Sequence, residues 1–293
     1  MRREHLAGHA MGLFVAFAFG SNYPIAKPVL AVIDPLVFST LRHGLTGALL
    51  ILALVLLRQP WRVARADLPK LALLGLVGYT VFQAGWAYGL YLTTPSKAVI
   101  LIATSPIFAA LFGRIMGERL SGLGWLGVAL AFVGVFIVVN NSLSSVNLAT
   151  DTVLGDCIYI AIAAIWALYG ALSRGSLLRL GTARTTGWSA LIGATLLLPF
   201  AGNDLIAQDW SSVTDWHWLA FLYTAVIGGC LGLCAWGGGL ARLGLTRITA
   251  YLYISPLFGI TISGLLLNQW LSGVQVLGAI VVLSGVALTQ TRG

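Results

Sequence analysis

The chain has 293 residues, of which 58% are hydrophobic and only 9% are charged, and its formal net charge is +8. Soluble domains carry roughly 45–50% apolar and about 25% charged residues. The composition therefore excludes an ordinary soluble domain and indicates an integral membrane protein.

Ten apolar stretches follow one another along the chain, and each could cross about 30 Å of hydrocarbon as a helix of roughly 17–25 residues. We therefore expect an all-α polytopic membrane protein with ten transmembrane helices. The first stretch is too long for a secretory signal and lacks a small-residue cleavage site, so we expect an uncleaved helix. The stretches lie at about 10–33, 36–57, 70–92, 96–116, 122–140, 153–173, 183–200, 217–241, 246–267 and 272–290.

Lys and Arg separate cleanly between the two sides of this predicted topology. Cytoplasmic connections collect basic residues, so the pattern places both termini in the cytoplasm. The positive charge follows from this topology, and we expect membrane lipid but no nucleic acid as a partner. The basic residues assigned to the cytoplasmic side are Arg2, Arg3, Arg58, Arg62, Arg65, Lys70, Arg114, Arg119, Arg174, Arg179, Arg184, Arg242, Arg247 and Arg292.

The sequence contains a tandem duplication. Ser105-Pro106-x-Phe108 recurs as Ser255-Pro256-x-Phe258, and the same offset of 150 residues places Trp86 over Trp236. We expect two repeats, at residues 1–145 and 146–293. Each holds five spans, an odd number, so the second repeat is inverted in the membrane. Inverted repeats are typical of transporters whose binding site lies where the repeats meet.

Several motifs occur in an order that resembles a known family. They are Phe19-Gly20-Ser21-Asn22-Tyr23 with Lys27, Leu41-Arg42-His43-Gly44, and the Ser105 motif followed by Gly117-Glu118-Arg119. Their order is similar to the drug/metabolite transporter superfamily in its ten-helix form with two EamA repeats. The second copy departs from the pattern, with Leu267-Asn268-Gln269 in place of the usual Gly-Glu pair.

The resemblance implies a central cavity lined by the first four helices of each repeat. It also implies similarity to bacterial exporters of aromatic or neutral amino acids, and hence a place in the bacterial cytoplasmic (inner) membrane. The substrate would be an amino acid or a related small metabolite, although fold alone does not determine it.

Aromatic and polar residues at helical spacing are the candidates for substrate binding. Tyr79, Gln83 and Trp86 fall at i, i+4 and i+7, on one helical face. Core packing or an interfacial belt would explain such rings equally well. A pocket of rings and few charges suits a neutral or zwitterionic molecule of moderate size. The full set of candidates is Asn22, His43, Tyr79, Gln83, Trp86, Trp166, Tyr169, Trp236, Tyr251 and Ser255.

Prolines inside the spans are candidates for hinges. Pro106 and Pro256 occupy matching positions in helices four and nine, whereas Pro24 in helix one has no partner in helix six. A static packing kink is the alternative for each proline. The pairing favours a symmetric hinge in an inverted-repeat carrier.

Two cations, Lys27 and Arg42, lie within predicted spans. They could form structural ion pairs with Asp34 or Asp156, or could attract a substrate anion at the outer mouth. No Asp or Glu falls near the middle of a span, which argues against a buried carboxylate relay for protons. His43 remains as a group able to form hydrogen bonds or to carry a proton.

These observations predict passive export by alternating access, with a proton-coupled drug/metabolite antiporter as the alternative. We expect no enzyme, because no nucleophile–base pair or acidic cluster is visible. The spacing of Cys157, Cys230 and Cys234 predicts neither a metal site nor a cofactor. Glycines in helices five and ten allow tight helix contacts, so a homodimer is compatible with the sequence.

Overall fold

The computed structural model describes residues 2–105, 107–108, 111–112, 122–141, 151–243, 248 and 251–289. That part of the chain is helical between short connections and contains no strand. The first repeat comprises α1 (Arg2–Val29), α2 (Pro35–Leu56), η1 (Arg65–Asp67), α3 (Leu68–Gly75), η2 (Leu76–Val81), α4 (Phe82–Leu92), α5 (Pro95–Ile102) and α7 (Gly122–Asn140).

The second repeat comprises α8 (Val153–Leu180), α9 (Thr182–Ala207), η3 (Trp210–Ser212), α10 (Asp215–Tyr223), η4 (Thr224–Leu231), α11 (Gly232–Leu243), η5 (Tyr251–Ile254), α13 (Ser255–Leu267) and α14 (Gly273–Thr289). Consecutive pieces such as α3, η2 and α4 join into single spans. Among the described residues, six helical runs meet the length and hydropathy of a membrane span by themselves. The expectation of a polytopic all-α protein with ten helices is confirmed.

Local chemistry explains where several helices begin and end. Pro35 and Pro95 open α2 and α5 in the first helical turn, where a missing N–H costs nothing. The Asp34 carboxylate accepts from the backbone N–H groups of Leu36 and Val37 and so caps α2. At the other terminus of a helix, Asn268 ends α13 in the left-handed conformation that Asn tolerates.

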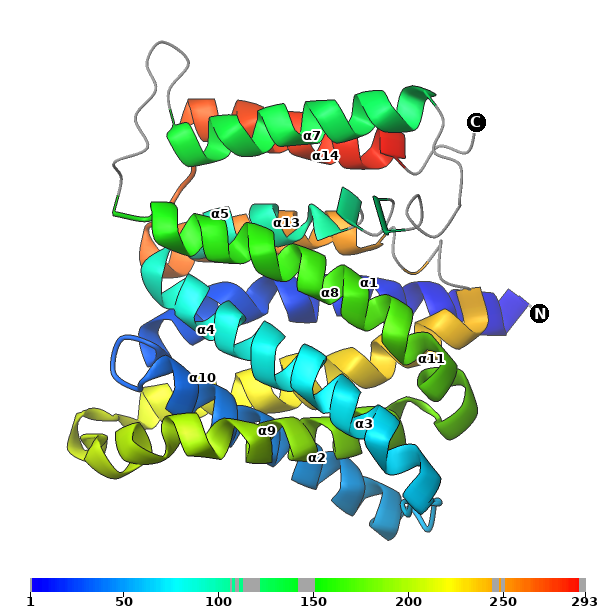
Figure 1. Ribbon diagram of the computed structural model, residues 1–293. Coiled ribbons are helices and arrows are strands. Elements are labelled where there is room, and N and C mark those ends of the chain that lie inside the picture. The colour runs from blue at the N-terminus through cyan, green and yellow to red at the C-terminus, as the bar shows by residue number, and fades with distance from the viewer. Residues whose placement is uncertain are drawn as a thin grey trace.

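The two repeats exchange their first helices (Figure 1). Helix α1 packs against α11 and α13 of the second repeat, while α8 packs against α4 and α5 of the first repeat. The second helices, α2 and α9, pack against each other at the edge of the bundle opposite α7 and α14 (Figure 1). This reciprocal pattern is the one that an inverted duplication generates, and it places the space between the repeats at the centre of the protein.

Helices α7 and α14 form a pair of their own at one edge of the bundle (Figure 1). Their backbones approach so closely that a Cβ added at Gly134 would lie 2.5 Å from the Val282 nitrogen. One added at Gly285 would lie equally close, at 2.5 Å, to the Ala131 nitrogen. These glycines therefore pack the two repeats together within one chain, and a homodimer would need another surface.

The third and eighth spans, α3–η2–α4 and α10–η4–α11, carry π-helical segments at matching positions. Segment η2 covers Leu76–Val81 and η4 covers Thr224–Leu231, so an offset of 150 residues superimposes their C-terminal ends. π-Helical turns inside α-helices leave carbonyls without their usual partner and occur frequently at functional sites. Segment η2 packs against α9, and η4 packs against α2.

Helices four and nine are interrupted just before their Ser-Pro motifs. After Ile102 the backbone tightens, with Thr104 N donating to Leu101 O at 3.2 Å, and Ser105 Oγ donates to Ile102 O at 2.7 Å. At the corresponding place, η5 is a 3₁₀ turn, and Pro256 lies in the first turn of α13. Pro106 lies outside the described residues.

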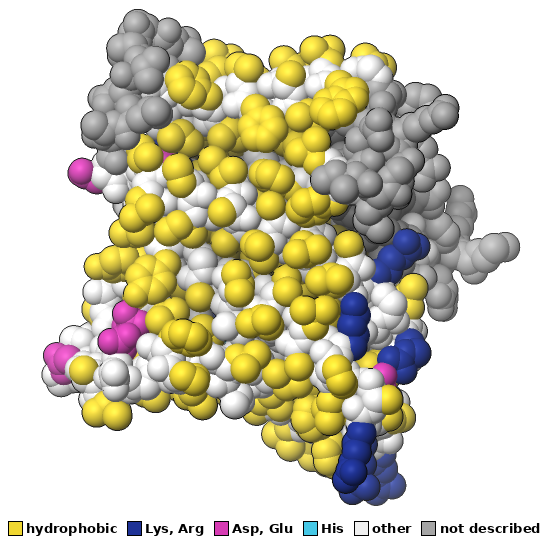
Figure 2. Space-filling model, viewed as in Figure 1, with side chains coloured by type: hydrophobic (Ala, Val, Ile, Leu, Met, Phe, Trp, Pro, Cys, Tyr) yellow, Lys and Arg dark blue, Asp and Glu magenta, His cyan; other side chains and the backbone are white. Residues whose placement is uncertain are grey.

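The two ends of the molecule differ in charge (Figure 2). Lys and Arg gather at the end where the N-terminus lies, which we call the basic end, and most acidic side chains lie at the opposite, acidic end. The face between the two ends is largely apolar in this view, as a surface in contact with lipid requires. Exposed acidic residues at the acidic end are Asp151, Asp204, Asp209 and Asp215.

Candidate functional site

A group of buried aromatic rings lies where the repeats meet. Tyr23 of α1 has its ring centroid 5.3 Å from that of Trp86 in α4 and 6.1 Å from that of Tyr159 in α8. The Tyr159 hydroxyl donates to the Trp86 carbonyl at 3.0 Å. Gly89 permits this approach, because a Cβ there would lie 2.8 Å from the Tyr159 ring. Three helices thus converge on Trp86.

The rings continue toward the basic end. Phe82, one helical turn before Trp86, has its centroid 4.8 Å from that of Trp166, which stacks on Tyr169 at 5.4 Å. Tyr169 meets Tyr79 edge-on at 6.0 Å. Edge-on and stacked contacts of this kind are favourable ring geometries. We call the seven residues Tyr23, Tyr79, Phe82, Trp86, Tyr159, Trp166 and Tyr169 the aromatic column.

Arg42 lies against this column in the interior. Its side chain comes from the eighth residue of α2, about 10 Å along the helix from Pro35 at 1.5 Å per residue. Only 4% of Arg42 is exposed. The guanidinium carbon stands 4.9 Å from the centroid of the Trp86 ring, within the range of a cation–π contact. The Arg42 Nε donates to the carbonyl of Thr224, at the start of η4, at 3.3 Å.

Polar atoms without partners accompany the rings. His43 is 2% exposed and meets Tyr79 edge-on at 5.4 Å. Although Gln83 lies near it, neither ring nitrogen has a hydrogen bond of acceptable geometry among the described residues. The Asn22 Oδ1 is likewise buried without a donor there. Buried polar atoms are normally satisfied, so these atoms mark a place that could receive a polar ligand.

Three candidates from the second repeat, Trp236, Tyr251 and Ser255, lie elsewhere. Tyr251 donates or accepts at His9 Nδ1 across 2.5 Å, close to the N-terminal part of α1. Ser255 lies at the crossing of α1 and α13, where a Cβ on Gly20 would meet its carbonyl oxygen at 2.3 Å. Trp236 makes no ring contact with the aromatic column in the described part of the chain. The structure thus brings together the candidates that lie in α1, in α2, in the span α3–η2–α4 and in α8.

The expected ion pairs of Lys27 and Arg42 with Asp34 or Asp156 are wrong. Lys27 Nζ donates to the carbonyls of Leu90, Tyr91 and Thr93, at 2.7, 2.8 and 2.8 Å. These contacts use all three ammonium hydrogens and cap the C-terminus of α4, where carbonyls lack partners and the helix dipole favours a cation. Lys27 is therefore a structural cation.

Asp156 pairs instead with Lys97, a contact that the sequence did not reveal. Lys97 Nζ lies 2.6 Å from Asp156 Oδ2, with 6% and 0% of the two side chains exposed. Thr93 Oγ1 also donates to Asp156 Oδ1 at 2.5 Å. The pair joins α5 of the first repeat to the first turn of α8, whose dipole favours an anion.

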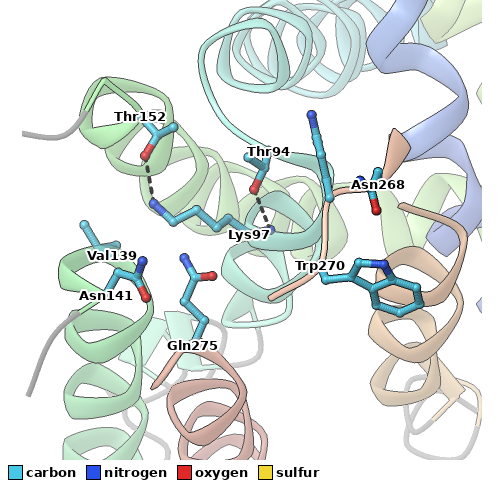
Figure 3. A pocket seen from close by; sticks show the side chains of 9 residues that line it. Thr94, Lys97, Val139, Asn141, Thr152, Asn268, Trp270 and Gln275 are labelled. Carbon is cyan, nitrogen blue, oxygen red and sulfur yellow. Dashed lines mark hydrogen bonds between the residues drawn. The ribbon is translucent and has the colours of Figure 1, made fainter. Parts of the chain in front are cut away.

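A recess of about 310 Å³ opens beside this ion pair (Figure 3). Thr94, Lys97 and Thr152 line one side, while Trp270 and Gln275 come from the α13–α14 connection and the start of α14. The recess is formed by connections at the acidic end and includes none of the aromatic column. Among its described lining residues the one cation is Lys97, which is already paired with Asp156.

The final list of candidates omitted Tyr23, Phe82 and Tyr159, which complete the column. Helical spacing does group Tyr159 with Trp166, seven residues later, and Phe82, four residues before Trp86, has a similar signal. For the Lys97–Asp156 pair the sequence shows only two opposite charges at the borders of apolar stretches, which does not indicate that these two side chains meet. Among the described residues, no group of three His, Cys, Asp or Glu side chains could hold a metal ion.

The fold and its centre define a class: a polytopic membrane protein of two inverted five-helix repeats whose central site is aromatic and holds few charges. The model of the EamA-like transporter family matches residues 6–140 and again residues 153–291. The chain therefore belongs to the EamA-like transporter family.

Several relatives extend over nearly the whole chain. It is 28% identical over 292 residues to a probable amino-acid metabolite efflux pump of Escherichia coli strain K12, covering 94% of this chain and 92% of that protein. It is 27% identical over 284 residues to an uncharacterized transporter of Archaeoglobus fulgidus, covering 97% of each. A crystal structure with 19% sequence identity matches 98% of this chain and 96% of that one with a TM-score of 0.66, which supports the fold alone.

The Lys97–Asp156 pair permits a stability test. Lys97→Met leaves the Asp156 carboxylate buried without its cation, so we expect the free energy of unfolding to fall by about 3–5 kcal/mol. Lys97→Met combined with Asp156→Leu removes both charges and should recover most of that loss. Unfolding of the purified protein in detergent, monitored by intrinsic fluorescence, measures both effects. A double variant as unstable as the single one would show that packing, not charge, dominates there.

Proposed function

We propose that this protein is a carrier of the bacterial inner membrane that exports neutral or aromatic amino acids, or similar small metabolites, by alternating access. The aromatic column between the repeats carries this proposal. Rings such as Trp86 and Trp166 provide apolar faces. Asn22 and His43 add buried polar atoms that have no hydrogen bond of acceptable geometry in the described part of the chain. Such a lining suits a ligand with an apolar side chain and a polar head. The name of the Escherichia coli relative is consistent with this substrate class.

The interruptions in four helices support the alternating movement. The matched π-helical segments and the matched breaks before the Ser-Pro motifs occur once in each repeat. Discontinuous helices near the middle of the membrane are common in carriers built from inverted repeats. Pro256, and by symmetry Pro106, would then act as hinges, while Pro24 would bend α1 without a counterpart.

We propose passive transport, because the described acidic side chains belong to helix ends and connections. They are Asp34, Asp67, Asp151, Asp156, Asp204, Asp209 and Asp215. The alternative, a proton-coupled drug/metabolite antiporter, is favoured by one observation: the buried His43 makes no hydrogen bond of acceptable geometry in the described chain, although Gln83 lies near it. Its imidazole could carry a proton between the two states of the cycle.

The charge distribution supports cytoplasmic termini. Exposed arginines occur where elements end on the side at which α1 begins: Arg58 follows α2, Arg62 precedes η1 and α3, and Arg174 lies in the last two turns of α8. A cysteine replacing the exposed Ser212 at the acidic end, in a protein without other cysteines, tests this orientation. We expect a membrane-impermeant maleimide to label it in intact cells. Labelling only after permeabilisation would reverse the orientation.

Uptake into liposomes containing the purified protein tests the function. Labelled neutral, aromatic, acidic and basic amino acids are supplied with and without a pH gradient. We expect saturable uptake of neutral or aromatic species that is accelerated by unlabelled substrate inside the vesicles and is unaffected by the gradient. Counterflow of this kind distinguishes a carrier from a channel. Uptake that requires the gradient would favour the antiporter, and no amino-acid uptake would contradict the proposal.

Two tryptophan variants test whether the substrate binds at the aromatic column. Trp166→Ala removes a ring of the aromatic column and should lower the uptake of aromatic amino acids about tenfold, given roughly 0.5–1.5 kcal/mol per ring contact beyond the area buried. Trp125→Ala is the control, because Trp125 in α7 is 48% exposed and far from the column in the helix order. Equal losses in both variants would place the binding site elsewhere.

A further inference from the structure

We propose that Arg42 is the anion-binding group of the substrate site and receives the carboxylate of the transported molecule. The inference rests on the proposed carrier function and narrows its substrates to molecules that carry a carboxylate. It depends on the charges around Arg42, on the donors that this side chain has left, and on its neighbours.

Arg42 is a buried cation without an anionic partner among the described residues. The ion pairs among the described residues are Lys97 with Asp156 and Arg179 with Asp67, and neither includes Arg42. The nearest acid along α2 is Asp34, about 12 Å away by helical rise, and its carboxylate caps the start of that helix. A charge inside the membrane is costly and is commonly compensated by a partner or by a function.

Most hydrogen-bond donors of Arg42 remain available. A guanidinium offers five N–H groups, and one of them, on Nε, donates to the Thr224 carbonyl. The described part of the chain supplies no acceptor for the terminal nitrogens. By contrast, the three donors of Lys27 are all used, and Lys97 bonds to both Asp156 and Thr152. Arg42 therefore has terminal N–H groups available, and a guanidinium can bind a carboxylate with two parallel hydrogen bonds.

The neighbours of Arg42 fit the rest of an amino acid. The Trp86 ring stands 4.9 Å from the guanidinium carbon and contacts Tyr23, so an apolar side chain has rings beside the cation. Segment η4 links Arg42 to Asn22: its Thr224 carbonyl accepts from Arg42, and a Cβ on Gly228 would lie 2.8 Å from Asn22 Oδ1. An unpaired amide oxygen one helical turn away is a suitable acceptor for a substrate ammonium group.

A purely structural role is the competing explanation, in which Arg42 only holds the π-helical carbonyl of Thr224. The two roles differ in how they respond to the substrate. Loss of a structural contact would slow transport of every substrate alike, whereas loss of an anion site would penalise only molecules with a carboxylate.

Transport of L-phenylalanine and L-phenylalaninamide by the full-length protein in liposomes separates the two roles. The amide keeps the ring and the amine but lacks the carboxylate. We expect the wild-type kcat/KM for phenylalanine to exceed that for the amide by about tenfold or more, since one charge-assisted bidentate contact is lost. Arg42→Gln should abolish this preference, mainly by raising the KM for phenylalanine. Arg42→Lys should restore part of it. Lys27→Gln is the matched control and should leave the preference unchanged.

Equal losses for both compounds in Arg42→Gln, or no preference in the wild type, would overturn the inference while leaving the carrier function intact. If the wild type transports neither compound, the proposed function fails, and binding decides the inference separately. Thermal unfolding is then followed with 3-phenylpropionate and with its amide. Stabilisation by the acid alone, lost in Arg42→Gln, supports the anion site; no stabilisation of the wild type overturns it.

Discussion

The backbone carbonyls that helix breaks release inside the membrane need donors from within the protein, because lipid offers none. In this chain the donors are side chains placed for that purpose. Lys27 satisfies three carbonyls at the end of α4, and Thr46 Oγ1 donates to Ala225 in η4 at 3.1 Å. A different contact is made by Thr80 in η2, which donates from the π-helical segment to the Gly193 carbonyl inside the continuous helix α9 at 3.1 Å. Without the contacts of Lys27 and Thr46, the interrupted helices would leave unpaired polar groups in a medium of low dielectric constant.

The contacts of Arg42, Thr46 and Thr80 also tie the two repeats to each other. Arg42 and Thr46 reach from α2 to backbone carbonyls of the π-helical segment η4. Thr80 reaches from the π-helical segment η2 to a carbonyl of α9. The bonds lie beside the aromatic column, so a change in either helix break would alter the surroundings of the proposed binding site. This arrangement gives a physical route by which substrate binding could be coupled to a movement of one repeat against the other.

Hydropathy and self-similarity were sufficient for the architecture, because span length and an odd number of spans per repeat constrain topology strongly. Helical spacing also identified Tyr79, Trp86, Trp166 and Tyr169 as rings that share a face. The partners of Lys27 and Asp156 could not be predicted in this way: which helix end an ammonium group reaches depends on how α1 crosses α4. No residue pattern in the sequence distinguishes the π-helical segments from the α-helices around them. Trp236 matches Trp86 in the repeat alignment, but it makes none of the ring contacts that Trp86 makes among the described residues.

The central claim is that the substrate lies among the rings with its carboxylate on Arg42. An experimental structure of the protein with bound phenylalanine, determined in a lipid environment, tests it most directly. The account predicts the carboxylate within hydrogen-bond distance of the Arg42 guanidinium and the phenyl ring against Trp86 or Tyr23. A ligand bound in the recess beside Lys97, or among the rings with its carboxylate turned away from Arg42, would contradict it.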